Sequence, residues 1–120
     1  MAKMRTLIVE DEAVIRLNIK MILSKINCET IGETSNGEDA VALAKELKPD
    51  VICMDIKLHG KMNGIEAAEK ISEFSETPFL FMSAFNHDDN KIDRDKIKKS
   101  AFLVKPIQKR QIELALKKIL

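Results

Sequence analysis

Short apolar runs alternate with amphipathic stretches along the whole chain, and this alternation restricts the fold more than any other feature of the sequence. Unbroken apolar strands separated by helices indicate a parallel sheet whose two faces are both covered. The predicted strands lie in five runs: TLIVE (6–10), ETIGET (29–34), KPDVICMDI (48–56), PFLFMS (78–83) and SAFLV (100–104).

The stretches between these runs carry aliphatic residues at helical spacing. The first helix is predicted within residues 13–26, the second begins at a capping box of Ser35 and Glu38, and the closing helix covers 107–120. Residues 86–100 contain two aliphatic residues, so a helix there would be the most polar and least anchored of the set. The inward-facing positions are predicted to be Ile15, Ile19, Ile22 and Ile26, then Ile65, Ala68 and Ile71, and finally Ile112, Ala115, Leu116 and Ile119.

Five βα units in 120 residues suit one α/β domain that covers residues 1–120. Right-handed crossovers leave few topologies for such a chain. We therefore expect a flavodoxin-like doubly wound five-stranded parallel sheet, (βα)5, with strand order 2-1-3-4-5.

Composition excludes several classes of protein. An apolar fraction of 45% provides a core and argues against disorder. We expect no membrane insertion, because no apolar stretch approaches the roughly 18 residues that span a bilayer. Two cysteines do not make a disulfide framework, so a reducing cytoplasm is the expected location.

Charge is unevenly distributed in this chain. The last thirty residues carry 10 basic and 3 acidic side chains, a net of +7, although the whole chain has a net charge of +1. Such a segment is either a solvated pair of helix faces or a docking face for an acidic partner. Direct nucleic-acid binding is not expected, because no zinc-ligand spacing, helix-turn-helix or aromatic platform accompanies the charge.

Polar side chains follow four of the predicted strands at the point where each strand ends. Glu10 and Asp11 end the first strand, Asp55 the third and Ser83 the fourth, and Lys105 follows the fifth. Ligands of open parallel sheets bind outside this edge. Clustered carboxylates suit Mg²⁺, while a lysine and a hydroxyl suit a phosphoryl group. An aspartate among them is equipped to act as a nucleophile that forms an aspartyl-phosphate.

Five motifs give the chain a resemblance to a known family: LIVEDE, DVICMDIKL, NGIEAA, FLFMSA and FLVKPI. Together they resemble the receiver domain of two-component response regulators, of the chemotaxis-regulator-like single-domain kind. The resemblance implies that Asp55 accepts a phosphoryl group from a histidine kinase or a histidine phosphotransfer protein. It also implies a cofactor, Mg²⁺, held by Glu10, Asp11, Asp55 and the backbone carbonyl of Lys57, with Glu10 acting through water.

The resemblance further implies how the protein switches. Lys105 pairs with the phosphoryl oxygens, Ser83 turns toward them, and Phe102 is the coupled aromatic switch. Output passes to a downstream protein, or to a second copy of the chain, through the face formed by residues 86–120. Such a switch catalyses its own phosphorylation and dephosphorylation but is not an enzyme with a separate substrate.

Two other functions fit the sequence less well. A phosphohydrolase with an aspartyl-phosphate intermediate needs a D-x-D pair after the first strand, and this chain has E-D-E there. A flavodoxin needs a hydroxyl- and glycine-rich loop after the first strand and aromatic residues beside the flavin, but this chain has EDEAVIR and no Trp or Tyr.

The loop after Asp55 differs from the family pattern: it has no proline and one extra residue. Phe85, two residues beyond Ser83, is predicted to pack on the surface near the site. His59 and His87 are predicted to be solvent-exposed and to be neither metal ligands nor phosphate carriers, because no acid or cysteine partners them at ligand spacing.

Overall fold

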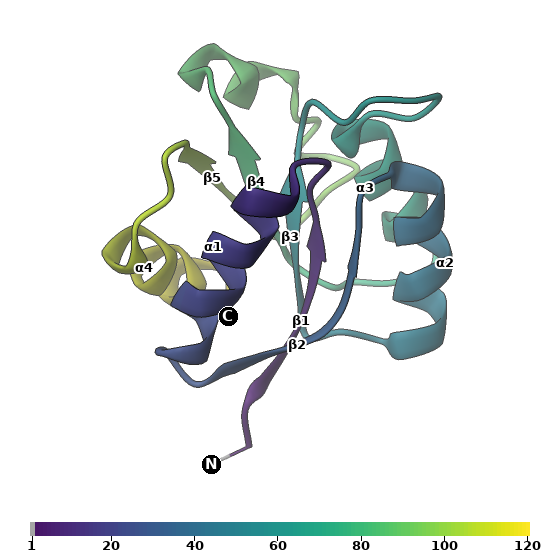
Figure 1. The fold of residues 1–120 in the computed structure, drawn as a ribbon. Helices are drawn as coiled ribbons and strands as arrows, with labels where there is room; N and C mark the ends of the chain where they lie inside the picture. Colours follow the sequence, from purple (N-terminus) through teal and green to yellow (C-terminus); the bar gives the residue numbers. More distant parts are fainter. Residues whose placement is uncertain (1) are drawn as a thin grey trace.

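A computed structural model describes residues 2–120, and its centre is one sheet of five parallel strands. The strands are β1 (Met4–Val9), β2 (Cys28–Thr34), β3 (Val51–Asp55), β4 (Phe79–Ser83) and β5 (Ser100–Val104). Their order across the sheet is β2-β1-β3-β4-β5 (Figure 1). The predicted fold class and strand order are therefore confirmed.

Helices cover both faces of this sheet (Figure 1). The helical elements are α1 (Ala13–Ser24), α2 (Gly37–Leu47), α3 (Gly64–Ser72), the 3-10 helix η1 (Asn86–Lys91) and α4 (Lys109–Ile119). One core cluster joins the sheet to α1 and α4, and a second joins the opposite face to α2, α3 and two residues of the β4–β5 connection, Ile92 and Ile97. Because both faces are covered, β3 and β4 are buried along their whole length.

The aliphatic positions predicted to face inward do so in most cases. All those named for α3 and α4 are buried, and Ile19 of α1 is buried as well. Ile15, Ile22 and Ile26 are only partly buried and pack at the margin of their cluster.

Two local predictions were wrong. The second helix is capped by Asn36, whose side chain accepts a hydrogen bond from the backbone N–H of Asp39 at 2.8 Å, and not by Ser35. The fourth connection contains a short 3-10 helix followed by turns, where the regular alternation predicted an α-helix. With Ile92 and Ile97 as its only aliphatic residues, this stretch has too little apolar surface to hold a longer helix against the sheet.

None of the helices within residues 2–120 combines the length and the apolar character that crossing a membrane requires.

Candidate functional site

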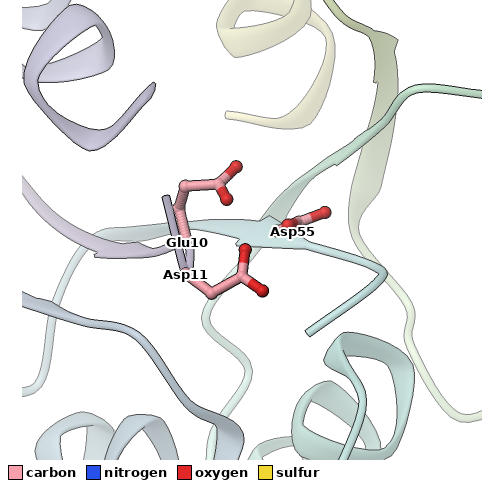
Figure 2. A group of neighbouring side chains, drawn as sticks. All are labelled: Glu10, Asp11 and Asp55. Carbon is pink, nitrogen blue, oxygen red and sulfur yellow. The ribbon is translucent and has the colours of Figure 1, made fainter. Parts of the chain in front are cut away.

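Three carboxyl groups meet at the carboxyl ends of β1 and β3. Each of Glu10, Asp11 and Asp55 offers an oxygen that lies within 4.8 Å of the others. Figure 2 shows the carboxyl groups of Glu10 and Asp11 directed toward the side on which Asp55 lies. Glu10 and Asp55 are buried, whereas Asp11 is partly exposed. The convergence of acids predicted from the strand ends is therefore present in the structure.

Backbone packing fixes the position of Asp55. It is the last residue of β3, and the N–H of the next residue, Ile56, donates to the carbonyl of Met82 at 2.9 Å. The first residue of α3, Gly64, lies directly against it: a Cβ on Gly64 would be 1.9 Å from the Asp55 carbonyl oxygen. The start of α3 and the end of β3 are thus in backbone contact, and only glycine permits that approach.

Lys105 brings the positive charge that the sequence predicted. Its Nζ donates a hydrogen bond to Oε1 of Glu10 at 2.6 Å and lies 3.4 Å from Oδ2 of Asp55. Its backbone N–H donates to the carbonyl of Ser83 at 2.8 Å, which ties the end of β5 to the end of β4. A single lysine therefore contacts two of the three acids.

Burial raises the pKa of two of the three acids. Burial raises the pKa of Glu10 to about 7, against the lowering effect of its hydrogen bond with Lys105. Burial also raises the pKa of Asp55, although the charge of Lys105 opposes the shift. Burial acts to raise the pKa of Asp11 too, but its hydrogen bonds with Glu10 and His59 lower it, and the net shift is downward. Burial lowers the pKa of Lys105, but the Glu10 and Asp55 carboxylates raise it, and the net shift is upward. A site with excess negative charge and oxygen ligands has the donor set that a hard divalent cation requires.

Lys57 connects this cluster to the loop after β4. Its backbone N–H donates to Oδ1 of Asp55 at 3.2 Å. Its side chain extends toward that loop, where Nζ lies 4.7 Å from the centre of the Phe85 ring and 4.0 Å from Oδ2 of Asp88. The predicted role of the Lys57 carbonyl as a metal ligand stays a prediction. Phe85 lies half exposed beside the site, as expected.

Ser83 is buried at the end of β4, and its hydroxyl has two partners. The hydroxyl donates to Oδ2 of Asp88 and accepts from the backbone N–H of Phe85 at 3.1 Å. Asp88 was not predicted as a site residue. Nothing in the sequence distinguishes it from its neighbour Asp89, because both lie in a polar stretch and only the turn of η1 buries one of them.

Phe102 lies on β5, next to the strand that carries Ser83. It is opposite Phe81 in the sheet register, while Ser83 is opposite Val104. It is partly buried and packs against the core cluster beneath α2 and α3. This is the neighbourhood predicted for an aromatic switch, and its movement stays a prediction.

Both histidines lie beside a carboxylate. Nδ1 of His59 contacts Oδ2 of Asp11, and Nε2 of His87 lies 3.6 Å from Oδ1 of Asp88. Both imidazole rings are mostly exposed, as predicted.

Comparison with known proteins gives concordant matches. A family model described as "Response regulator receiver domain" matches residues 6–117. The chain is 38% identical over 116 residues to the chemotaxis protein CheY of Thermotoga maritima, with 96% of each chain covered. It is 36% identical over 102 residues to the transcriptional regulatory protein YdfI of Bacillus subtilis, with 84% of this chain and 47% of that protein covered.

Solved structures include a similar chain in the CheX-CheY-BeF3-Mg+2 complex from Borrelia burgdorferi. That chain has a TM-score of 0.81 and 25% sequence identity, and the match covers 94% of this chain and 86% of the other. The region matched by the family model contains the acidic cluster at the strand ends.

Proposed function

The chain belongs to the response regulator receiver domain family of two-component signalling, and on that premise we propose that it is a switch controlled by phosphorylation of Asp55. A single observation carries the proposal: the buried carboxylate of Asp55 ends β3 beside two further acids and 3.4 Å from the Lys105 ammonium. The proposed unit is one receiver domain over residues 1–120, of which the family model matches residues 6–117.

The proposed reaction is phosphoryl transfer from a phosphohistidine on a histidine kinase or a phosphotransfer protein. A carboxylate oxygen of Asp55 attacks phosphorus, the P–N bond to histidine breaks, and the imidazole nitrogen keeps the electron pair and takes up a proton. Lys105 already lies at ion-pair distance from the attacking carboxylate, so it is placed to pair with the phosphoryl oxygens. The switch acts on its own aspartate and has no separate substrate.

Mg²⁺ is the proposed cofactor. Glu10, Asp11, Asp55 and the Lys57 carbonyl would hold it, with Glu10 acting through water. A bound Mg²⁺ neutralises charge that builds up on the phosphoryl oxygens during transfer. The raised pKa values of Glu10 and Asp55 support the proposal, because burial disfavours their ionised forms and a bound cation would compensate that charge.

An opening beside Lys105 supports access by a protein donor. A cavity of about 490 Å³ lies between α1 and the β5–α4 loop, lined by Val14, Ile15, Asn18, Lys105, Pro106 and Ile107. Val14, which lines the cavity, is exposed, and so are Leu17 and Met21 of the same helix. A protein that presents a phosphohistidine would bury this apolar surface as it docks.

The proposed output surface is the face formed by residues 86–120, which includes η1, β5 and α4. Phe102 lies on β5 within it, Ser83 adjoins it at the end of β4, and the last thirty residues have a net charge of +7. In the cytoplasm, an acidic protein or a second copy of the chain would bind this face once phosphorylation has altered its shape.

Phosphorylation of Asp55 is tested with acetyl phosphate and Mg²⁺, followed by mass spectrometry of the intact chain. We expect one added phosphoryl group in the wild type and none in Asp55→Asn. Asp50→Asn is the matched control, because Asp50 lies just before the other end of β3 and is exposed. Undiminished labelling of Asp55→Asn would contradict the assignment.

A further inference from the structure

Asp88 is a fully buried carboxylate on η1, outside the acidic cluster. Within residues 2–120, its Oδ1 is the one buried side-chain oxygen or nitrogen without a hydrogen-bond partner. Burial of a carboxylate costs free energy unless hydrogen bonds or charged partners compensate it, so the contacts around Asp88 decide whether it stays buried. The position of Asp88 in a short polar connection gives no packing reason for that burial.

The partner of its other oxygen is the hydroxyl of Ser83. A serine hydroxyl has one proton, and here that proton is donated to Oδ2 of Asp88. The same hydroxyl accepts from the Phe85 N–H, which holds it in this orientation. A hydroxyl engaged in this way cannot at the same time donate to a phosphoryl oxygen on Asp55.

Three basic side chains lie around the buried carboxylate. Lys91 Nζ is 3.0 Å from Oδ1, at ion-pair distance but outside hydrogen-bonding geometry, and His87 Nε2 is 3.6 Å from the same oxygen. Lys57 Nζ approaches Oδ2 at 4.0 Å. All three side chains are at least half exposed, so they can follow the carboxylate toward water.

We propose that Asp88 is a positioning residue that holds the Ser83 hydroxyl in the unphosphorylated protein, so that a phosphoryl group on Asp55 must compete with Asp88 for it. The proposal rests on the proposed function, because it requires Asp55 to be phosphorylated. When Ser83 turns to the phosphoryl group, Asp88 loses the hydrogen bond from its hydroxyl and keeps only its contacts with the exposed basic side chains around it. The buried carboxylate then becomes unfavourable, and η1 moves outward with it.

Lys57 makes this release depend on the acidic cluster as well. Its N–H contacts Asp55, while its ammonium group contacts both Asp88 and the Phe85 ring. A movement of the loop after Asp55 therefore displaces Lys57 and changes its contact with Asp88. The two loops respond together, and the output face is altered where η1 joins it.

The test is a fluorine NMR titration with beryllium fluoride and Mg²⁺, in which beryllium fluoride stands in for the phosphoryl group. We expect Asp88→Ala to bind it about tenfold more tightly than the wild type, since no hydrogen bond to a charged group has to be broken first. Asp89→Ala, a change to the neighbouring acid of η1, should bind like the wild type. Asp88→Asn keeps the shape of the side chain and weakens its hydrogen bond with Ser83, so it should show a smaller gain in affinity for beryllium fluoride. This variant should remain folded even if Asp88→Ala does not.

A double-mutant cycle separates this role from a purely structural one. Adding Asp88→Ala to Ser83→Ala should give no gain in affinity, because the contact is already absent. Equal or weaker binding by folded Asp88→Ala and Asp88→Asn would overturn the proposal while leaving phosphorylation of Asp55 intact. If the wild type itself failed to bind beryllium fluoride, the proposed function and the role of Asp88 would both be wrong.

Discussion

The connections that follow β3 and β4 start from the same edge of the sheet but are secured in different ways. The first leads into α3, which has a capping box of Asn63 and Glu66 and buries five of its nine residues. The second contains η1 and turns, and its buried residues are Asp88, Ile92 and Ile97. One connection is held by a continuous apolar face and a cap, the other by two isoleucines and a buried carboxylate.

This difference assigns the two connections different tasks. A helix with a continuous buried face opens only at the expense of many contacts together. A segment that depends on a few contacts can be released by a change in one of them. The connection after β3 is therefore suited to keeping Asp55 in place, and the connection after β4 to moving when Ser83 changes partner.

The largest effect is expected on the rigid side of this comparison. Gly64→Ala would place a Cβ 1.9 Å from the carbonyl oxygen of Asp55 and 2.9 Å from the Cα of Ile56. These are backbone atoms, so no side-chain rotation relieves the overlap. We expect a loss of more than about 3 kcal/mol in the free energy of unfolding, measured by denaturant titration followed by circular dichroism.

Gly60→Ala is the control for this substitution. Gly60 has a φ of +106°, but no atom lies within 4 Å of the position that a Cβ on it would occupy, so only backbone strain of about 1 kcal/mol is expected. Similar losses for the two variants would show that the contact between α3 and Asp55 is not rigid.

An intermediate effect is expected in native-state hydrogen exchange. Amides of residues 86–99 should exchange at least about tenfold faster than those of α3 and α4, because few buried contacts oppose local opening. Asp88→Ala should accelerate exchange in residues 86–99 and leave α3 unchanged. Equal protection from hydrogen exchange in residues 86–99 and in α3 of the wild type would contradict the difference between the two connections.

The smallest effect is expected from pH, and it distinguishes Glu10 and Asp55, whose pKa values are raised, from Asp88, whose pKa is lowered. The pKa of Glu10 is raised from its ordinary value of 4.5 to about 7, so the folded state binds this proton more tightly than the unfolded state. Stability should therefore fall as pH rises from 4.5 to about 7, and the raised pKa of Asp55 acts in the same direction. Burial raises the pKa of Asp88, but its contacts with Ser83 and Lys91 lower it, and the net shift is downward. This shift stabilises the fold at pH values above the ordinary pKa of 3.8.

Thermal unfolding without divalent cations, between about pH 5 and about pH 7, measures this effect as a decrease of a few degrees in Tm. Glu10→Gln should reduce the decrease, whereas Glu12→Gln, at an exposed acid two residues away, should not. Mg²⁺ should also reduce it, because cation binding stabilises the ionised acids. A Tm that rises over this range would contradict the assignment of the raised pKa to Glu10.

The site could be predicted from sequence wherever a strand defined its position. Asp55 and Ser83 end buried apolar runs, and a parallel sheet brings the ends of such runs to the same edge. The same reasoning placed Glu10 and Asp11 beside Asp55 and Lys105 within reach of Glu10 and Asp55, as the structure has them.

The remaining features depend on turns, where neighbouring residues of the same type are not equivalent. Asp88 is buried and Asp89 is not, because a 3-10 turn directs one of the two side chains inward. In the same way Asn36 caps α2 in place of Ser35, since its side chain is the one that reaches the N–H of Asp39. Hydrophobic periodicity contains no information on either choice.

The place of Phe85 in the loop after β4 has a practical consequence. Its ring lies over the Lys57 ammonium, its N–H contacts Ser83, and about half of its surface is exposed. The sequence contains neither Trp nor Tyr. A tryptophan substituted at this one position would be the sole strong fluorophore of the chain, and its emission would report on the loop directly, which makes this surface a natural place to convert the domain into an optical sensor.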